Sequence, residues 1–110
     1  MEKFIKGDVI VIPFPFSDLT GSKKRPTLVL ADLPGDDILL CQITSQFTKD
    51  SFAIPLTNKD FLVGSLPSES NIRPSRIFTA EKNIIERKTG TINNIVFKIV
   101  VQKIIDIIQK

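Results

Sequence analysis

The hydrophobic pattern of this chain changes its period once, at about Asn93. From there to the C-terminus the apolar residues recur at helical spacing with polar residues between them, and the apolar positions are Val96, Phe97, Val100, Val101, Ile104, Ile105 and Ile108. Before Asn93 the apolar residues come in short, β-branched runs that are separated by Pro, Gly and polar turn residues. The pattern therefore predicts five or more short strands followed by one amphipathic helix.

Turn-forming residues set the bounds of these runs. The predicted strands cover residues 8–12, 27–31, 38–45 and 52–56, with extended chain over 71–82 that Pro74 interrupts, and a short strand or turn at 84–85 and 90–92. Pro13 and Pro15 are expected to stop the first strand, and Pro55 indicates an edge strand, because proline cannot donate to a sheet ladder. Short strands joined by tight turns favour a small SH3-like β-barrel with one packed helix over an open sheet, since closure removes exposed edges.

The length of the chain limits its organisation. With 110 residues, of which 42% are hydrophobic, it can bury one core and is too short for a second, so residues 1–110 are expected to form one domain. The first residues lack the apolar core of a signal peptide, and no apolar run approaches the roughly 18 residues of a membrane span. We therefore expect a cytoplasmic protein without membrane contact, whose net charge of +3 permits binding to a polyanion without requiring it.

Residues that are missing exclude several kinds of chemistry. The chain has no His and a single Cys, Cys41, so it cannot build a His general base, a Ser-His-Asp triad, a Cys-His pair or an ordinary zinc site. The adjacent carboxylates Asp36 and Asp37 lie in a predicted turn, and no other acidic residues have a spacing typical of metal ligands. We expect no metal and no cofactor, and we interpret Cys41, inside an apolar run, as a small buried hydrophobic residue.

Five stretches of sequence keep a recognisable order along nearly the whole chain. They are GDVIVI at 7–12 with GSKKRPTLVL at 21–30, QITSQ at 42–46, IRPSRIFT at 72–79 and GTI at 90–92. Together they resemble the MazF/PemK family of bacterial toxin endoribonucleases. The loop before the Arg-Pro step is shorter and more basic than is common in that family, so the resemblance carries over no particular cleavage sequence.

This resemblance implies a function and a site. Family members form an SH3-like barrel with a C-terminal helix, pair as homodimers, cut single-stranded RNA without a metal, and are held inactive by a cognate antitoxin protein. Two residues carry the chemistry in the family, the Arg of the Arg-Pro step and the Thr that ends the third strand. By position these are Arg25 and Thr44.

The chemistry of RNA cleavage is compatible with that pair of residues. RNA brings its own nucleophile, because the ribose 2′-OH lies beside the scissile phosphate. A guanidinium such as that of Arg25 can grip two phosphate oxygens as negative charge builds, and the hydroxyl of Thr44 can donate to a phosphate oxygen. The sequence leaves open what accepts the 2′ proton, with water, Asp18 and another group of the same loop as alternatives.

Further residues are candidates for RNA binding, each with a structural alternative. The basic pair Lys23 and Lys24 is expected to contact the RNA backbone, or to be a solvated loop, and Ser45 and Gln46 are expected to contact a phosphate or a base edge, or to brace the loop. Phe14 and Phe16 are expected to stack on a base, or to belong to the core. Arg73 is expected to contact RNA, or to pair with Glu69 or Glu81. Two other functions remain open from the sequence. One is a non-catalytic barrel that binds RNA or protein, and the other is a toxin of related fold that acts on a protein target.

Overall fold

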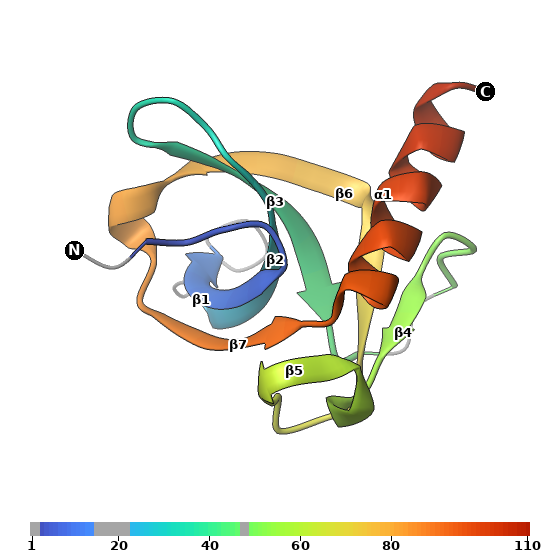
Figure 1. Cartoon of the computed structure of the whole chain (residues 1–110), viewed down its shortest axis with the longest axis horizontal. Coiled ribbons are helices and arrows are strands. Elements are labelled where there is room, and N and C mark those ends of the chain that lie inside the picture. The colour runs from blue at the N-terminus through green and yellow to red at the C-terminus, as the bar shows by residue number, and fades with distance from the viewer. Residues whose placement is uncertain (1–2, 15–22, 47–48) are drawn as a thin grey trace.

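A computed structural model describes residues 3–14, 23–46 and 49–110, which form a curled antiparallel sheet and a C-terminal helix (Figure 1). The strands are β1 (Asp8–Phe14), β2 (Lys23–Asp32), β3 (Asp37–Thr44), β4 (Ile54–Leu56), β5 (Phe61–Gly64), β6 (Ser70–Glu81) and β7 (Arg87–Ile92), and the α-helix is α1 (Asn94–Ile108). Two single 3-10 turns, Asn58–Asp60 and Lys82–Ile84, precede β5 and β7.

The sheet has the strand order β4-β6-β3-β2-β1-β7-β5. It confirms the expected mainly β fold with a C-terminal helix, and the strong curl of the sheet gives it the form of a half-barrel (Figure 1). Within the described residues the curl does not close, because β4 and β5 stand at its two edges. Pro55 lies in β4, so the expectation that it marks an edge strand is confirmed.

Each face of the sheet carries its own hydrophobic core. On one face, alternate strand residues such as Val9, Leu28, Cys41 and Ile72 pack with the helix residues Val96, Phe97 and Val100. On the other face, a second cluster consists of Ile10, Ile12, Val29, Ile38 and Leu40. Cys41 is fully buried, as the sequence predicts, and burial raises the pKa of its thiol to about 12, so it stays protonated.

The helix begins where the hydrophobic period changes. The side chain of Asn93 caps it by accepting a hydrogen bond of 2.9 Å from the backbone N–H of Val96. Figure 1 shows α1 running alongside β6. Ile95 and Ile99, one helical turn apart on the helix, are exposed, and so is Ile108 near its C-terminal end. No helix among the described residues is long and apolar enough to cross a membrane.

The first strand differs from its prediction. Pro13 does not stop β1, which continues to Phe14, with Pro13 opposite Lys24 of β2. The carbonyl of Val11 accepts a hydrogen bond from Glu86, on the side where β7 approaches. The backbone groups of Pro13, two residues later, point to the same side, but the pairing with β7 has already ended at Val11. The missing N–H of Pro13 therefore breaks no hydrogen bond of the ladder.

Two other strands also correct the sequence prediction. β2 begins at Lys23, so Arg25 lies within a strand and not at its entrance. β6 runs on through Pro74, because the ladder with β3 shifts there: Cys41 is opposite Ile77 and the next residue, Gln42, is opposite Arg73. Residues 74–76 thus form a bulge.

The short strand β5 has no counterpart among the predicted strands, and it depends on two glycines. Gly64 has a φ of +79°, and a Cβ at this position would overlap the carbonyl oxygen of Thr89. Gly90, opposite Gly64 in β7, leaves equally little room, since its Cβ would overlap the carbonyl oxygen of Val63. This close approach of two backbones is what joins β5 to β7.

We expect Gly64→Ala to lower the free energy of unfolding by more than about 2 kcal/mol, because strain and a backbone clash combine. Gly35→Ala is the matched control: Gly35 has a φ of +78°, but nothing lies within 4 Å of the position its Cβ would take. It should cost only about 1 kcal/mol, the strain alone. Urea unfolding of both variants measures the difference, and equal losses would contradict the clash.

Candidate functional site

The two residues expected to carry chemistry lie on neighbouring strands and on the same face. In the antiparallel pair of β2 and β3, Thr27 is opposite Gln42. Arg25 lies two residues before Thr27, and Thr44 lies two residues after Gln42. Because the strands are antiparallel, both residues lie towards the same end of the pair. Because side chains alternate along a strand, all four share one face, and Arg25 and Thr44 lie at the same end of it, beyond the last paired residues of β2 and β3.

This polar group continues the second core cluster. Arg25 is paired with Ile12 of β1, and Val29 and Leu40 stand on the same face as Thr27 and Gln42. On β2 and β3, the apolar residues of this face lie at one end and the polar residues at the other, while the apolar Ile12 of β1 lies beside Arg25. The arrangement gives a partly buried guanidinium and a hydroxyl a rigid support of packed strands.

Arg25 and its neighbour Lys24 have different surroundings. Among the described residues, no carboxylate pairs with Arg25, which is half-buried. The ammonium of Lys24 lies 2.9 Å from Glu86 Oε1, and Lys24 is on the opposite face from Arg25 because the two are consecutive in a strand. The structure therefore does not bring these two cations together, and Glu86 partly neutralises the charge of Lys24.

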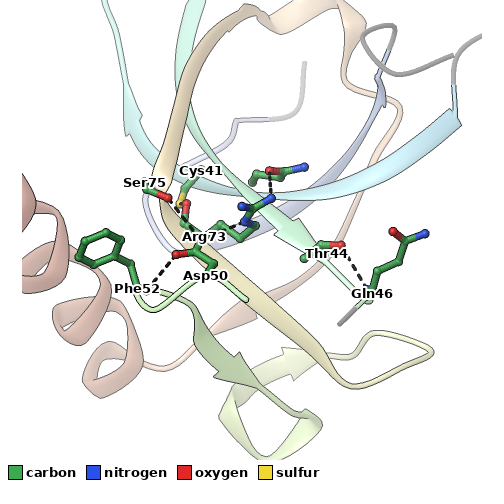
Figure 2. Close-up of polar contacts among 8 residues, drawn as sticks. Cys41, Thr44, Gln46, Asp50, Phe52, Arg73 and Ser75 are labelled. Carbon is green, nitrogen blue, oxygen red and sulfur yellow. Dashed lines mark hydrogen bonds and ion pairs between the residues drawn. The ribbon is translucent and has the colours of Figure 1, made fainter. Parts of the chain in front are cut away.

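Thr44 ends β3 with its hydroxyl oriented by the following turn. The residue is 8% exposed, and its Oγ1 accepts a hydrogen bond of 3.2 Å from the backbone N–H of Gln46 (Figure 2). A hydroxyl that accepts one bond still has its own proton to donate. Ser45 and Gln46 are exposed, and the Gln46 side chain extends beside Thr44 in Figure 2.

Arg73 makes an ion pair that the sequence did not suggest. Its partner is neither Glu69 nor Glu81 but Asp50, with Arg73 Nε 3.0 Å from Asp50 Oδ2. The side chains are 19% and 6% exposed, respectively. Arg73 is opposite Gln42 in the β3–β6 ladder, and its Nη1 donates to Gln42 Oε1 at 3.4 Å. The ion pair thus adjoins the face that carries Arg25 and Thr44.

Both oxygens of the Asp50 carboxylate are occupied. Oδ1 accepts from the backbone N–H of Phe52 at 2.9 Å, and Oδ2 accepts from Arg73 and from the hydroxyl of Ser75 at 3.3 Å (Figure 2). Burial by itself would raise the pKa of Asp50, but the hydrogen bonds from Phe52, Arg73 and Ser75 and the charge of Arg73 outweigh it. The pKa is therefore held below the usual value of 3.8.

This lowered pKa has a consequence for stability. Asp50 stabilises the folded chain fully above its unfolded-state pKa, near 3.8, and the contribution is lost as the pH falls through the lower folded-state value. We expect Asp50→Asn to unfold at a lower urea concentration than the wild type at pH 7, with a smaller gap at about pH 3. A gap independent of pH would mean that the charge of Asp50 is not what stabilises the chain.

Thr27 is a buried polar residue on this same face. It is fully buried, and its Oγ1 has no hydrogen-bond partner among the described residues. An unpaired buried hydroxyl costs about 1–3 kcal/mol.

The sequence alone did not indicate Thr27, Gln42 or Asp50 as residues of the candidate site. Only the alternation Gln42-Ile43-Thr44 points to Gln42, and no local signal points to Asp50, 23 residues before Arg73.

Several of the expected RNA-binding residues are not placed by the structure. The backbones of Phe14 and Lys23 are opposite each other at the ends of β1 and β2, but their side chains are outside the described part. Phe16 and Asp18 lie outside the described residues altogether.

Two other features of the described residues bear on ligands. No group of three His, Cys, Asp or Glu gathers among them where a metal could bind. A cavity of about 610 Å³ contains none of the candidate residues; it is lined by Lys3, Phe4, Asp32, Gly35, Asp36, Lys82 and Asn83.

One family model matches nearly the whole chain. Residues 5–108 match the family described as PemK-like, MazF-like toxin of type II toxin-antitoxin system. No curated protein matches the sequence.

Solved structures share the fold at low sequence identity. A MazE-MazF crystal structure from Deinococcus radiodurans is 17% identical, with a TM-score of 0.75 and 96% of each chain covered. An endoribonuclease in complex with its cognate antitoxin, from a mycobacterial species, is 14% identical with a TM-score of 0.74, covering 97% of this chain and 96% of that one. The toxin MazF-mt6 of Mycobacterium tuberculosis is also 14% identical, with a TM-score of 0.67, covering 91% and 96%.

Proposed function

Because this chain belongs to the family of PemK-like, MazF-like toxins of type II toxin-antitoxin systems, we propose that it is a metal-independent endoribonuclease that cleaves single-stranded RNA. The observation that carries the proposal is the position of Arg25 and Thr44. They stand on adjacent strands, on one face and at one end, where a single phosphodiester can meet both. No described carboxylate competes for Arg25.

The reaction uses the substrate's own hydroxyl. The ribose 2′ oxygen attacks the adjacent phosphorus, the bond from phosphorus to the 5′ oxygen breaks, and the products carry a 2′,3′-cyclic phosphate and a 5′-OH. The 2′ proton leaves and the 5′ oxygen gains one, so protons balance. The pentavalent transition state carries extra negative charge on its non-bridging oxygens.

Arg25 and Thr44 act on that charge. The planar guanidinium of Arg25 donates two hydrogen bonds to the phosphate oxygens as negative charge builds on them. The Thr44 hydroxyl donates a further bond, while its oxygen is held by the N–H of Gln46. Donors fixed in advance on packed strands stabilise the transition state without reorganising.

The proposal includes partners and a compartment. A cognate antitoxin is expected to neutralise the chain, and a homodimer is expected because Ile95 and Ile99, one helical turn apart, form an uncovered apolar patch on α1. Its RNA substrate gives it a cytoplasmic location.

A fluorogenic single-stranded RNA incubated with the pure protein in excess EDTA tests the activity. We expect cleavage to persist and the products to carry 2′,3′-cyclic phosphate and 5′-OH ends, with no cleavage of the same sequence as 2′-O-methyl RNA. Binding without cleavage would instead favour a non-catalytic module. Loss of cleavage in EDTA that Mg²⁺ restores would contradict the mechanism.

A further inference from the structure

Gln42 lies on the face that carries Arg25 and Thr44, between two neighbouring strands. It is opposite Thr27 of β2 on one side and opposite Arg73 of β6 on the other. Thr44 is two residues further along β3, about 7 Å along the strand, and Arg25 is two residues before Thr27. Gln42 is partly exposed, whereas Thr27 is fully buried. RNA held by Arg25 and Thr44 is therefore within reach of the long Gln42 side chain.

One end of the Gln42 amide is already occupied. Its Oε1 accepts a hydrogen bond of 3.4 Å from Arg73 Nη1, and Arg73 is itself held by the ion pair of 3.0 Å with Asp50. Asp50 also accepts from the backbone N–H of Phe52 and from the hydroxyl of Ser75, so the support of the amide is fixed. A guanidinium can only donate, so the amide presents its oxygen to Arg73. The Nε2 group remains, and no described residue accepts a hydrogen bond from it.

The polar groups of this face present donors outwards, because their acceptors are engaged within the protein. The guanidinium of Arg25 has no acceptor at all. The hydroxyl oxygen of Thr44 already accepts from the N–H of Gln46, and Gln42 Oε1 accepts from Arg73. Base edges display donors as well as acceptors, whereas a phosphate displays acceptors only. This set of groups therefore fits the phosphates of RNA better than its bases.

We propose that Gln42 binds a phosphate of the RNA backbone: its Nε2 donates to a non-bridging oxygen, while Arg73, a positioning residue held by Asp50, fixes which end of the amide is free for RNA. This inference rests on the proposed endoribonuclease activity, and it adds a neutral donor to Arg25 and Thr44. It gives Arg73 a role other than the direct RNA contact expected from the sequence. A contact of this kind positions RNA without reading its sequence.

Gln42→Met tests the inference, because it keeps the length of the side chain and removes the amide. Fluorescence anisotropy measures binding of single-stranded 2′-O-methyl RNA, which the proposed mechanism cannot cleave. We expect Kd to rise about tenfold, as for the loss of one hydrogen bond to a charged group, and by the same factor for an all-adenine, an all-uracil and a mixed sequence. A rise confined to some sequences would show base contact and overturn the inference.

The salt dependence of binding separates a neutral donor from a cation. Gln42→Met should leave the slope of log Kd against log salt concentration at its wild-type value, because an amide releases no counterion from RNA. Arg25→Ala should reduce that slope by about 0.7, because one cationic contact to a single strand is lost. A reduced slope in Gln42→Met as well would mean that the substitution acts by displacing an arginine, which would overturn the inference.

Asn83→Leu is the matched control. It also exchanges an amide for an apolar side chain of similar size, at an exposed residue of the 3-10 turn Lys82–Ile84. Asn83 lines the cavity that contains none of the candidate site residues. Its Kd should stay at the wild-type value. A loss of binding equal to that of Gln42→Met would overturn the inference, because the effect would not be specific to the Gln42 position.

Arg73→Lys tests the positioning role. A lysine can still pair with Asp50, but it lacks the planar fork that also reaches Gln42 Oε1. We expect Kd to rise by a smaller factor than for Gln42→Met, because the amide is then free to turn. The double variant should bind like Gln42→Met alone, since Arg73 acts through Gln42. Losses that add would show that Arg73 contacts RNA itself, and would overturn its positioning role.

The remaining outcomes distinguish this inference from the proposed function. A wild type that binds RNA but cleaves none in EDTA removes the proposed function, while the Kd values still decide the role of Gln42. A folded Gln42→Met protein with wild-type Kd overturns the inference alone. If Gln42→Met does not fold, Gln42→Glu keeps an acceptor for Arg73, removes the donor and adds a negative charge. It should weaken binding at least as much, and an unchanged Kd would again overturn the inference.

Discussion

Arg25→Ala is expected to slow RNA cleavage by about 10³-fold or more, by analogy with the loss of an arginine that stabilises a phosphoryl-transfer transition state. The guanidinium puts a positive charge on the face that also carries Thr44, and no described carboxylate neutralises it. Single-turnover cleavage of a fluorogenic RNA in EDTA measures the rate, and circular dichroism checks that the fold is retained.

Two further substitutions separate the geometry of Arg25 from its charge. Arg25→Lys keeps the charge but loses the planar fork, so its rate should lie between those of the wild type and Arg25→Ala. Arg87→Ala removes an exposed cation in β7 that is opposite Val11, on the other face from Arg25. It should change the rate by less than about threefold. Equal losses for Arg25→Ala and Arg87→Ala would mean that only net charge matters.

Local patterns in the sequence predict most of the fold. The change of period at Asn93 locates α1 to within a residue, and the β-branched runs find β1, β2, β3 and β4. These elements bury alternate or helically spaced side chains, so their own sequence records which face is buried. The candidate pair Arg25 and Thr44 rests instead on the family resemblance of the sequence blocks, and its role stays a prediction.

What the sequence does not predict depends on partners that are distant along the chain. β1 can contain Pro13 because its pairing with β7 ends before that residue. The strand β5 depends on close contact between Gly64 and Gly90. The ion pair of Arg73 with Asp50 depends on a bulge in β6. None of these leaves a periodic signal, because each arises from how separate segments meet in the folded sheet.

Thr44→Val has the second largest expected effect. The substitution keeps the shape of the side chain but removes the hydroxyl that we propose donates to the phosphate, and loss of one such donor costs about 10²–10³ in kcat. It also leaves the N–H of Gln46 without its acceptor. Thr44→Ser keeps the hydroxyl and should retain activity within about tenfold of the wild type.

Thr27→Val is the control that isolates the hydroxyl of Thr44. It makes the same chemical change on the same face, two strand positions from Arg25, at a hydroxyl that is fully buried and finds no partner in the described part of the chain. Removing an unpaired buried hydroxyl should raise the free energy of unfolding by about 1 kcal/mol and leave cleavage unchanged. If Thr44→Val cleaves as fast as Thr27→Val, the Thr44 hydroxyl takes no part in catalysis and Arg25 must stabilise the transition state without it.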